Sequence, residues 1–334
     1  MNTYGNLFKV TLYGESHQPA MGVVVEGMPA GIKINENILK NDLSKRRPGA
    51  VGTTTRVEKD EYVMTSGVFN GVTTGSPIHI MIENKDVRSK DYTALKTHPR
   101  PGHADFVANV KYHGFHDYRG GGRFSGRLTA SLVCAGSLAK HFLPFKVNHK
   151  LVQVGTLTDL SKLDAYLDKI SQEGDSVGGI IELSTSPLPV GLGEPFFQKL
   201  DAEIARMMFT IPAVKGVEIG TGFSGISLKG SAFNDAIIDD SGKTETNHSG
   251  GLSGGLSNGN ALKVRVMVKP TSSIKKQQNT FDYTSKSKKA LKIEGRHDVC
   301  IARRIGIVLE NALAIVLADM FLMNQTYKTF TNNR

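Results

Sequence analysis

The sequence predicts an α+β fold built on antiparallel strands. Residues 57–83 alternate apolar and polar positions and are interrupted by glycines, which is typical of an antiparallel meander. Elsewhere helix and strand patterns alternate only loosely, without the regular period of a parallel sheet. Residues 300–323 form a long apolar stretch that predicts a buried helix. Because the chain has 334 residues, 39% of them hydrophobic, and no evident linker, we expect residues 1–334 to form a single domain.

The amino-terminal half begins with two predicted strands and a helix. Residues 8–13 alternate with the two-residue period of a half-buried strand and lead directly into Gly-Glu-Ser-His at 14–17. A second strand is expected at 22–26. Asn35 can cap the helix that follows, and Pro48 stops it.

The later elements also have recognisable patterns. A helix is expected to begin near Ser125, because apolar residues from Leu128 to Phe142 are spaced for one buried stripe. Further helices are expected at 160–171 and 200–208, strands at 179–183, 214–219, 226–229 and 263–269, and a glycine-rich loop at 247–259.

The charge of the chain favours an anionic partner. The formal net charge is +10, and such an excess attracts anions. The densest basic tract, 286–292, has no interleaved aromatic residues on which bases could stack, so it indicates a solvated face. We therefore expect a small anion and no nucleic acid, although a basic nucleic-acid-binding protein remains an alternative.

The sequence also argues against membrane insertion, secretion and disulfides. The apolar stretch 305–322 contains Glu310, Asn311 and Asp319, which would be costly to bury in a bilayer. Residues 1–9 lack the pattern of a secretory signal, which predicts a cytoplasmic protein. The two cysteines, Cys134 and Cys300, are expected to be free thiols, and no metal site is predicted.

The segment 118–127, Tyr-Arg-Gly-Gly-Gly-Arg-Phe-Ser-Gly-Arg, predicts an anion site. Its glycines let backbone amides approach a ligand, and the start of the following helix adds partial positive charge. Its arginines can grip phosphate or carboxylate at two points. A flexible loop would explain the glycines alone, but it leaves the arginines unexplained.

Two other glycine patterns do not have the context that their motifs need. Residues 220–225 fit the dinucleotide pattern, but the expected strand at 226–229 stands where that motif requires a helix. Residues 251–255 fit a nucleophile elbow, but glycines lie on both sides. A serine hydrolase using Ser253 and His248 is kept as an alternative.

Several titratable residues lie in loops where catalytic groups are common. His17 follows the first strand, and His103 lies in a proline- and glycine-rich loop beside an arginine and a carboxylate, a setting that can tune an imidazole near neutrality. Asp298 precedes the last helix, where helix capping and catalysis are both open. Arg46 lies at a helix end, where basic residues are favourable in any case.

Taken together, these segments resemble the chorismate synthase family. The resemblance runs from Gly5 to about Leu322. It is carried by Gly-Glu-Ser-His at 14–17, Arg-Arg-Pro-Gly at 46–49, Thr-Thr-Arg at 54–56, Ser-Gly-Val-Phe at 66–69, Thr-Thr-Gly-Ser-Pro-Ile at 73–78, Arg-Pro-Gly-His-Ala-Asp at 100–105, Tyr-Arg-Gly-Gly-Gly-Arg at 118–123, Val-Lys-Gly-Val-Glu-Ile-Gly at 214–220, Asn-His-Ser-Gly-Gly at 247–251, Lys-Pro-Thr-Ser-Ser at 269–273 and Gly-Arg-His-Asp at 295–298.

The resemblance implies a reaction without net redox change. Enolpyruvylshikimate phosphate (EPSP) loses phosphate and a ring hydrogen to give chorismate, with reduced FMN (FMNH2) as transient electron source and later as base. His103 would protonate reduced flavin and His17 the departing phosphate. Asp298 would activate the flavin nitrogen that removes the hydrogen, with Ser16 and Ser125 as hydrogen-bonding relays.

The resemblance also implies the binding residues and the assembly. Arg46 would hold the substrate, and FMN would contact Arg123, Phe124, Ser125, Pro212, Ala213, Gly254, Lys269, Pro270, Thr271, Ser272, Ser273 and Arg296. Antiparallel sheets would flank a central helical layer in a β-α-β sandwich, and the protein would be a homotetramer. An external flavin reductase or other source would deliver reduced FMN, with NADPH involved only indirectly.

The sequence departs from the family pattern at four positions. Gln18 replaces a glycine, Gly52 an arginine, Phe124 a small hydroxyl residue and Val299 a proline. We expect the arginine missing at Gly52 to matter most. Its loss would weaken the binding of substrate or nicotinamide by roughly 1.5 to 3 kcal/mol if the contact was charge-assisted.

Overall fold

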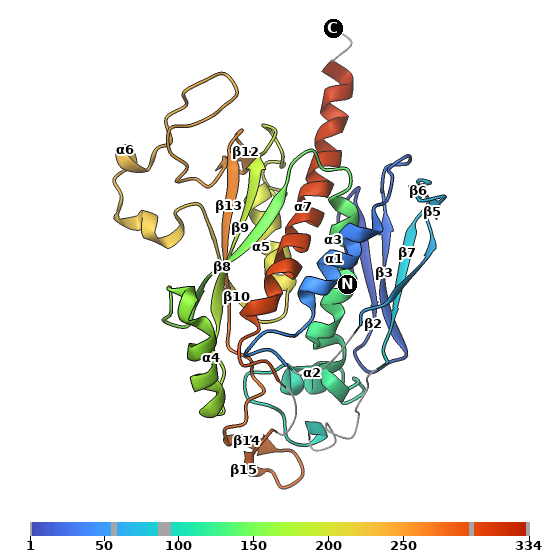
Figure 1. Ribbon diagram of the computed structural model, residues 1–334, viewed down its shortest axis with the longest axis vertical. Helices are drawn as coiled ribbons and strands as arrows, with labels where there is room; N and C mark the ends of the chain where they lie inside the picture. The colour runs from blue at the N-terminus through green and yellow to red at the C-terminus, as the bar shows by residue number, and fades with distance from the viewer. Residues whose placement is uncertain (1, 55–58, 86–94, 294–296, 332–334) are drawn as a thin grey trace.

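The computed structural model describes residues 2–54, 59–85, 95–293 and 297–331, with side chains of the last helix up to Tyr327. Two antiparallel sheets lie on either side of a layer of helices, as Figure 1 shows. The predicted α+β sandwich is therefore confirmed. The predicted antiparallel pairing is also correct, because every strand pair in both sheets is antiparallel.

The first sheet contains five strands in the order β1-β2-β3-β7-β4. Their bounds are β1 Thr3–Tyr4, β2 Lys9–Gly14, β3 Ala20–Glu26, β4 Tyr62–Ser66 and β7 Ile78–Glu83. Alternate residues of β3 and β7 are fully buried, including Val23, Val25, Ile80 and Ile82. The meander expected at 57–83 is partly interrupted, because β5 Val68–Phe69 and β6 Val72–Thr73 form a separate hairpin; residues 57 and 58 lie outside the described part.

The second sheet contains four strands in the order β10-β13-β9-β8. Their bounds are β8 Val147–Val154, β9 Gly179–Pro187, β10 Val214–Ile219 and β13 Ala261–Val268. Two more hairpins extend from this half: β11 Leu252–Ser253 with β12 Leu256–Ser257, and β14 Gln278–Asp282 with β15 Ser287–Leu291.

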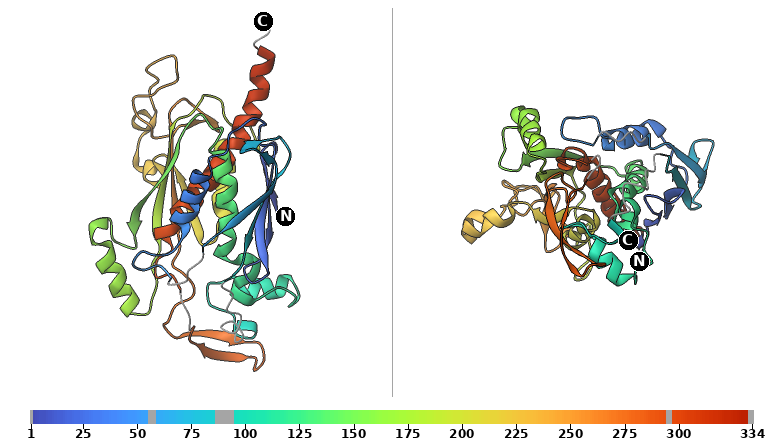
Figure 2. Two further views of the ribbon diagram at one scale, coloured as in Figure 1. Left: turned by 45° about the vertical axis from the view of Figure 1, so that its right-hand side comes forward. Right: turned by 90° about the horizontal axis from the view of Figure 1, so that it is seen from below.

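The helices between the sheets are α1 Glu36–Arg46, α3 Thr129–Ala139, α5 Leu200–Thr210 and α7 Ala302–Thr331. Every residue of α3 is buried. At Gly136 an added Cβ would lie 2.3 Å from the carbonyl oxygen of Asn311, so a glycine is needed for α3 to approach α7 this closely. The two views of Figure 2 show α7 running between the sheets.

The remaining helices lie outside this layer. They are α2 Asp105–Lys111, α4 Leu163–Gln172 and α6 Gly230–Phe233, with 3-10 turns at η2 Arg119–Phe124, η3 Gly126–Leu128, η4 Leu160–Lys162 and η5 Gly222–Ser227. The strand expected at 226–229 is wrong, because η5 ends there and exposes Ile226 instead of pairing it.

Helix α7 is long and apolar enough to cross a bilayer, but 89% of its most apolar stretch is buried within the protein. Its polar residues have partners inside. Asp319 accepts hydrogen bonds from the backbone amides of Asn6, Leu7 and Phe8 at 2.7–3.0 Å. The helix is therefore a core element, as its interrupted hydrophobicity predicts.

Candidate active site

A cavity of about 190 Å³ lies where α1 ends and α7 begins. Among the described residues, four arginines line it, Arg46, Arg100, Arg127 and Arg304, together with the carboxylate of Asp298. Ser125, Thr271 and His297 contribute further polar groups. Such a concentration of guanidinium groups in a small, partly enclosed space suits a ligand with several negative charges.

Asp60 holds two of these arginines in place. Its Oδ2 accepts from Nε and Nη2 of Arg46 at 3.2 and 2.7 Å, and its Oδ1 pairs with Arg127. Burial would raise the pKa of Asp60, but the two guanidiniums outweigh it and hold that pKa below its usual value. One ionised carboxylate thus fixes two arginines that face the cavity, and the local charge stays positive.

Asp298 is held by a third arginine and by a backbone amide. Its carboxylate accepts from Arg304 at 3.0 Å (Nε) and 2.8 Å (Nη2), and from the backbone N–H of Thr54 at 3.0 Å. Asp298 is 8% exposed. Because Arg304 belongs to α7, the first turns of the core helix set the position of this carboxylate.

The triple-glycine turn lies against both His17 and His103. Gly120 has a φ of +57°, and a Cβ there would lie only 2.1 Å from Cε1 of His17. Gly121 has a φ of +81°, and its Cβ would lie 3.3 Å from Cε1 of His103. The two imidazoles therefore meet adjacent residues of one turn, although they are 86 positions apart in sequence.

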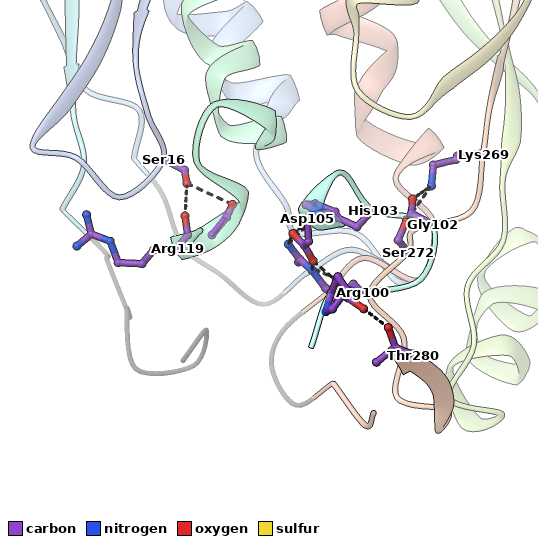
Figure 3. Close-up of polar contacts among 12 residues, drawn as sticks. Ser16, Arg100, Gly102, His103, Asp105, Arg119, Lys269, Ser272 and Thr280 are labelled. Carbon is purple, nitrogen blue, oxygen red and sulfur yellow. Dashed lines mark hydrogen bonds and ion pairs between the residues drawn. The ribbon is translucent and has the colours of Figure 1, made fainter. Parts of the chain in front are cut away.

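Ser16 supports His17. Its hydroxyl lies 3.1 Å from Nδ1 of His17 and 3.2 Å from the carbonyl oxygens of Arg119 and Gly120, as Figure 3 shows for the carbonyl contacts. Both Ser16 and His17 are buried. The strand β2 ends at Gly14, so its end delivers this pair to the glycine turn.

The segment 269–273 lies beside the His103 loop. Lys269 donates from Nζ to the carbonyl of Gly102 and to Oγ of Ser272, both at 2.7 Å, and Arg100 donates to Oγ of Ser273 at 3.1 Å (Figure 3 shows the Lys269 contacts). Burial and the nearby charge of Lys215 lower the pKa of Lys269.

Two other predicted cofactor residues, Pro212 and Ala213, adjoin this segment, and Pro270 and Thr271 lie within it. The carbonyl of Ala213 accepts from the backbone N–H of Lys269 at 2.8 Å, and this hydrogen bond places Pro212 and Ala213 next to Lys269. Ala213 itself has a φ of +74°. Thr271 lines the cavity, and its hydroxyl is buried without a hydrogen-bond partner among the described residues. Pro270 lies between Lys269 and Thr271 in the same segment.

Other predicted residues lie elsewhere. The guanidinium of Arg123 donates to the carbonyls of Gly14 and Leu12 and to Asn2, and Phe124 is 37% exposed. Gly254 forms the turn of the β11–β12 hairpin, at the opposite end of the protein from α2 in Figure 1. Arg296 lies outside the described residues.

The alternative hydrolase pair does not form a catalytic arrangement. Oγ of Ser253 accepts from Asn258 at 3.1 Å, whereas Nδ1 of His248 is hydrogen-bonded to Thr221 at 2.9 Å. A serine nucleophile needs a base within hydrogen-bond reach. The geometry therefore gives no support to a serine hydrolase.

Sequence reasoning missed three of the four cavity arginines as site residues. Arg100 and Arg127 belong to motifs that drew attention for their histidine and glycines, and Arg304 lies in the helix predicted as core. The positions of these arginines within their motifs are visible in the sequence, but nothing in one sequence shows that the C-terminal end of α1 and the N-terminal ends of α3 and α7 meet at the same cavity.

Known proteins match this chain along almost its whole length. The sequence profile of the chorismate synthase family matches residues 8–322. The chorismate synthase of Chitinophaga pinensis is 50% identical over 327 residues, covering 97% of this chain and 98% of the relative. That of Methanocaldococcus jannaschii is 40% identical over 365 aligned positions, with 96% of each covered.

A solved structure agrees with the sequence matches. A crystal structure of chorismate synthase superimposes with a TM-score of 0.76 at 26% sequence identity, covering 99% of this chain and 98% of that one. Fold, sequence and conserved length thus point the same way, and the chain belongs to the chorismate synthase family, lyases of aromatic amino-acid biosynthesis.

Proposed function

We propose that this enzyme converts EPSP into chorismate by eliminating phosphate, the last common step of the shikimate pathway. The observation that carries the proposal is the cavity lined by four arginines, next to a glycine turn that meets two histidines. EPSP carries two carboxylates and a phosphate, so it has the charge that this cavity suits. Arg46 and Arg127, both braced by Asp60, supply part of a rigid binding surface.

The residues around the cavity also fit reduced FMN. The buried hydroxyl of Thr271, which lines the cavity, lacks a partner among the described residues and can hydrogen-bond a polar group of the cofactor. Lys269, Ser272 and Ser273, with Pro212 and Ala213, would hold the cofactor. When bound, reduced FMN supplies a transient electron and then takes up the ring hydrogen of the substrate.

The protein's own groups would move and hold protons. His17, supported by Ser16, would be the proton donor to the departing phosphate, and His103 would hold the proton for the reduced flavin. Asp298 would activate the flavin nitrogen that takes the hydrogen, and Ser125, which accepts from the backbone N–H of Arg127 at 3.3 Å, lies in the same lining. Positioned acids of this kind contribute about 10²- to 10⁴-fold in rate.

Two of the departures from the family pattern contact each other. The backbone N–H of Val299 donates to the carbonyl of Gly52 at 2.9 Å, a bond that a proline at 299 could not make. Gly52 has a φ of +77°, and an added Cβ would lie 2.7 Å from Cδ1 of Leu167, so an arginine would strain the backbone of this turn and displace that side chain. We infer that this contact helps to place Asp298, the neighbour of Val299, without the arginine.

The remaining expectations belong to the same proposal. We propose a single-domain, cytoplasmic homotetramer that receives reduced FMN from an external flavin reductase, with NADPH only as a source of reducing equivalents and with no nucleic-acid or membrane partner. One core cluster that includes residues of both sheets and the helices supports the single domain.

The test is anaerobic turnover of EPSP with photoreduced FMN, followed by the absorbance of chorismate. Asp298→Ala should lose at least about 100-fold in kcat while FMN still binds, because the carboxylate acts only in the chemical step. Asp164→Ala is the matched control, since Asp164 pairs with Arg303, the neighbour of Arg304, but is exposed and outside the cavity lining. Near-normal turnover by Asp298→Ala would contradict the proposed role, and no chorismate from the unaltered protein would contradict the function.

A further inference from the structure

Asp105, the first residue of α2, is a carboxylate at the centre of the His103 loop. Its Oδ1 lies 2.6 Å from Nδ1 of His103. Arg100 donates to the same carboxylate from Nε at 2.8 Å, from Nη2 at 2.9 Å and from its backbone N–H at 3.0 Å. Figure 3 shows the three side chains pointing toward one another. One carboxylate therefore joins the imidazole and the guanidinium.

The ionisation of Asp105 determines which nitrogen of His103 carries the hydrogen. Burial would raise the pKa of Asp105, but hydrogen bonds from Arg100 and His103 outweigh it and hold that pKa well below its usual value. An ionised carboxylate can only accept hydrogen bonds. Nδ1 of His103 must therefore be the donor, and in the neutral ring Nε2 carries the lone pair.

Nε2 of His103 faces the glycine turn. A Cβ at Gly121 would lie 3.5 Å from this nitrogen, so the missing side chain leaves the ring edge open toward the turn that His17 also meets. Nη2 of Arg100 lies 3.1 and 3.2 Å from the two ring nitrogens, and Ser273 and Asp105 fix that guanidinium.

The other charged or titratable groups near this cluster come from neighbouring segments. Lys269 binds the carbonyl of Gly102, and Tyr283 follows β14, with a pKa raised by burial and by the charge of Asp105. Asp105 is the carboxylate in contact with His103 among the described residues. No other described group has the charge and position to hold the Nδ1–H form.

We propose that Asp105 is a positioning residue, which holds His103 in the Nδ1–H form and directs Nε2 toward the reacting centre. The proposal rests on the proposed function, in which His103 transfers the proton. Asp105 itself touches neither substrate nor cofactor in this role. It acts through the ring, as the carboxylate behind a catalytic histidine does in other enzymes.

The first test reads the ring directly and needs no substrate. ¹⁵N NMR of histidine-labelled protein, with the His103 signals assigned by their loss in His103→Gln, should show the Nδ1–H form in the unaltered enzyme. In Asp105→Asn the signals should move toward the Nε2–H form. An Nε2–H ring in the unaltered protein would overturn the proposal, even if the asparagine variant folds poorly.

The second test is a double-mutant cycle in anaerobic turnover. Asp105→Asn should lower kcat about 100-fold with FMN affinity retained, since the acid is then mispositioned. In a His103→Ala background the same change should lower kcat less than about twofold, because the residue acts through His103. If the two losses multiply instead, Asp105 has an independent structural role and the proposal is wrong.

A control removes another carboxylate that faces a histidine. Asp282 lies 3.4 Å from His98 and pairs with Lys289, outside the cavity lining. Asp282→Asn should keep kcat within about threefold. The NMR result separates the two proposals: an Nδ1–H ring in a protein that makes no chorismate would support the positioning role and contradict the function.

Discussion

The two histidines that meet the glycine turn have different hydrogen-bond partners among the described residues. His103 lies among charged groups, hydrogen-bonded to Asp105 and adjacent to Arg100. Nδ1 of His17 faces the neutral hydroxyl of Ser16, which also lies within hydrogen-bond distance of backbone carbonyls. A charged partner fixes the ring strongly and selects one tautomer, whereas a hydroxyl can donate or accept and allows either. The difference fits a His103 with one fixed proton path and a His17 that can exchange its proton with a leaving group.

The two adjacent glycines offer the largest expected effect. Gly120→Ala should lower kcat at least about 10³-fold, because its Cβ would lie 2.1 Å from the ring of His17 and must displace it. Gly121→Ala should lower kcat only about tenfold, since its Cβ would lie 3.3 Å from His103. Both have positive φ, so the backbone strain is matched. Equal losses in the two variants would show that strain, not the collision with His17, governs activity.

The hydroxyl beside His17 should have an intermediate effect. Ser16→Ala removes a neutral hydrogen bond at 3.1 Å, and we expect kcat to fall about tenfold. We expect the effect of this substitution to appear in the pH profile of kcat more than in KM, because the arginines proposed to bind the substrate are unchanged. A loss as large as that expected for Asp105→Asn would show that the neutral and charged supports contribute equally, against the comparison drawn above.

The smallest effect concerns stability at low pH. The folded pKa of Asp105 is lowered, so its contribution is fully present above the unfolded value of about 3.9 and is lost as pH falls toward the folded value. Between pH 6 and 3, the unaltered protein should lose about 1 kcal/mol more unfolding free energy than Asp105→Asn. Urea midpoints at fixed protein concentration measure this. Ser16→Ala should follow the unaltered protein, and identical curves for all three would contradict the charged surroundings assigned to His103.

The sequence predicted the layers better than the cavity. Alternation in 8–13 and 179–183 and the apolar run of α7 depend on local periodicity, and the structure has these elements. The convergence of Arg46, Arg127 and Arg304 depends on where the C-terminal end of α1 and the N-terminal ends of α3 and α7 lie in space. Local sequence patterns do not encode these positions. The contact between Gly52 and Val299 is similar, since it joins residues 247 positions apart.

One prediction from local periodicity was wrong because the expected strand has no neighbouring strand with which to pair. Residues 226–229 alternate like a strand, but β10 already pairs with β13 on one side and ends at Ile219. Without a neighbouring strand to accept its hydrogen bonds, the segment forms short helical turns. The identification of His17, His103 and Asp298 as site residues came from motifs, and their roles stay predictions until the variants are measured.

The contact of Asp319 with the amides of Asn6, Leu7 and Phe8 constrains how the nascent chain can fold. These three residues are synthesised well before the carboxylate that binds them, which lies 311 to 313 positions later on α7, the helix that packs on β8 and β9 of the second sheet. Contacts so distant in sequence form slowly. The amides of Asn6, Leu7 and Phe8 therefore gain this partner only after residue 319 has been synthesised, and partly folded chains that still expose apolar surface are prone to aggregation.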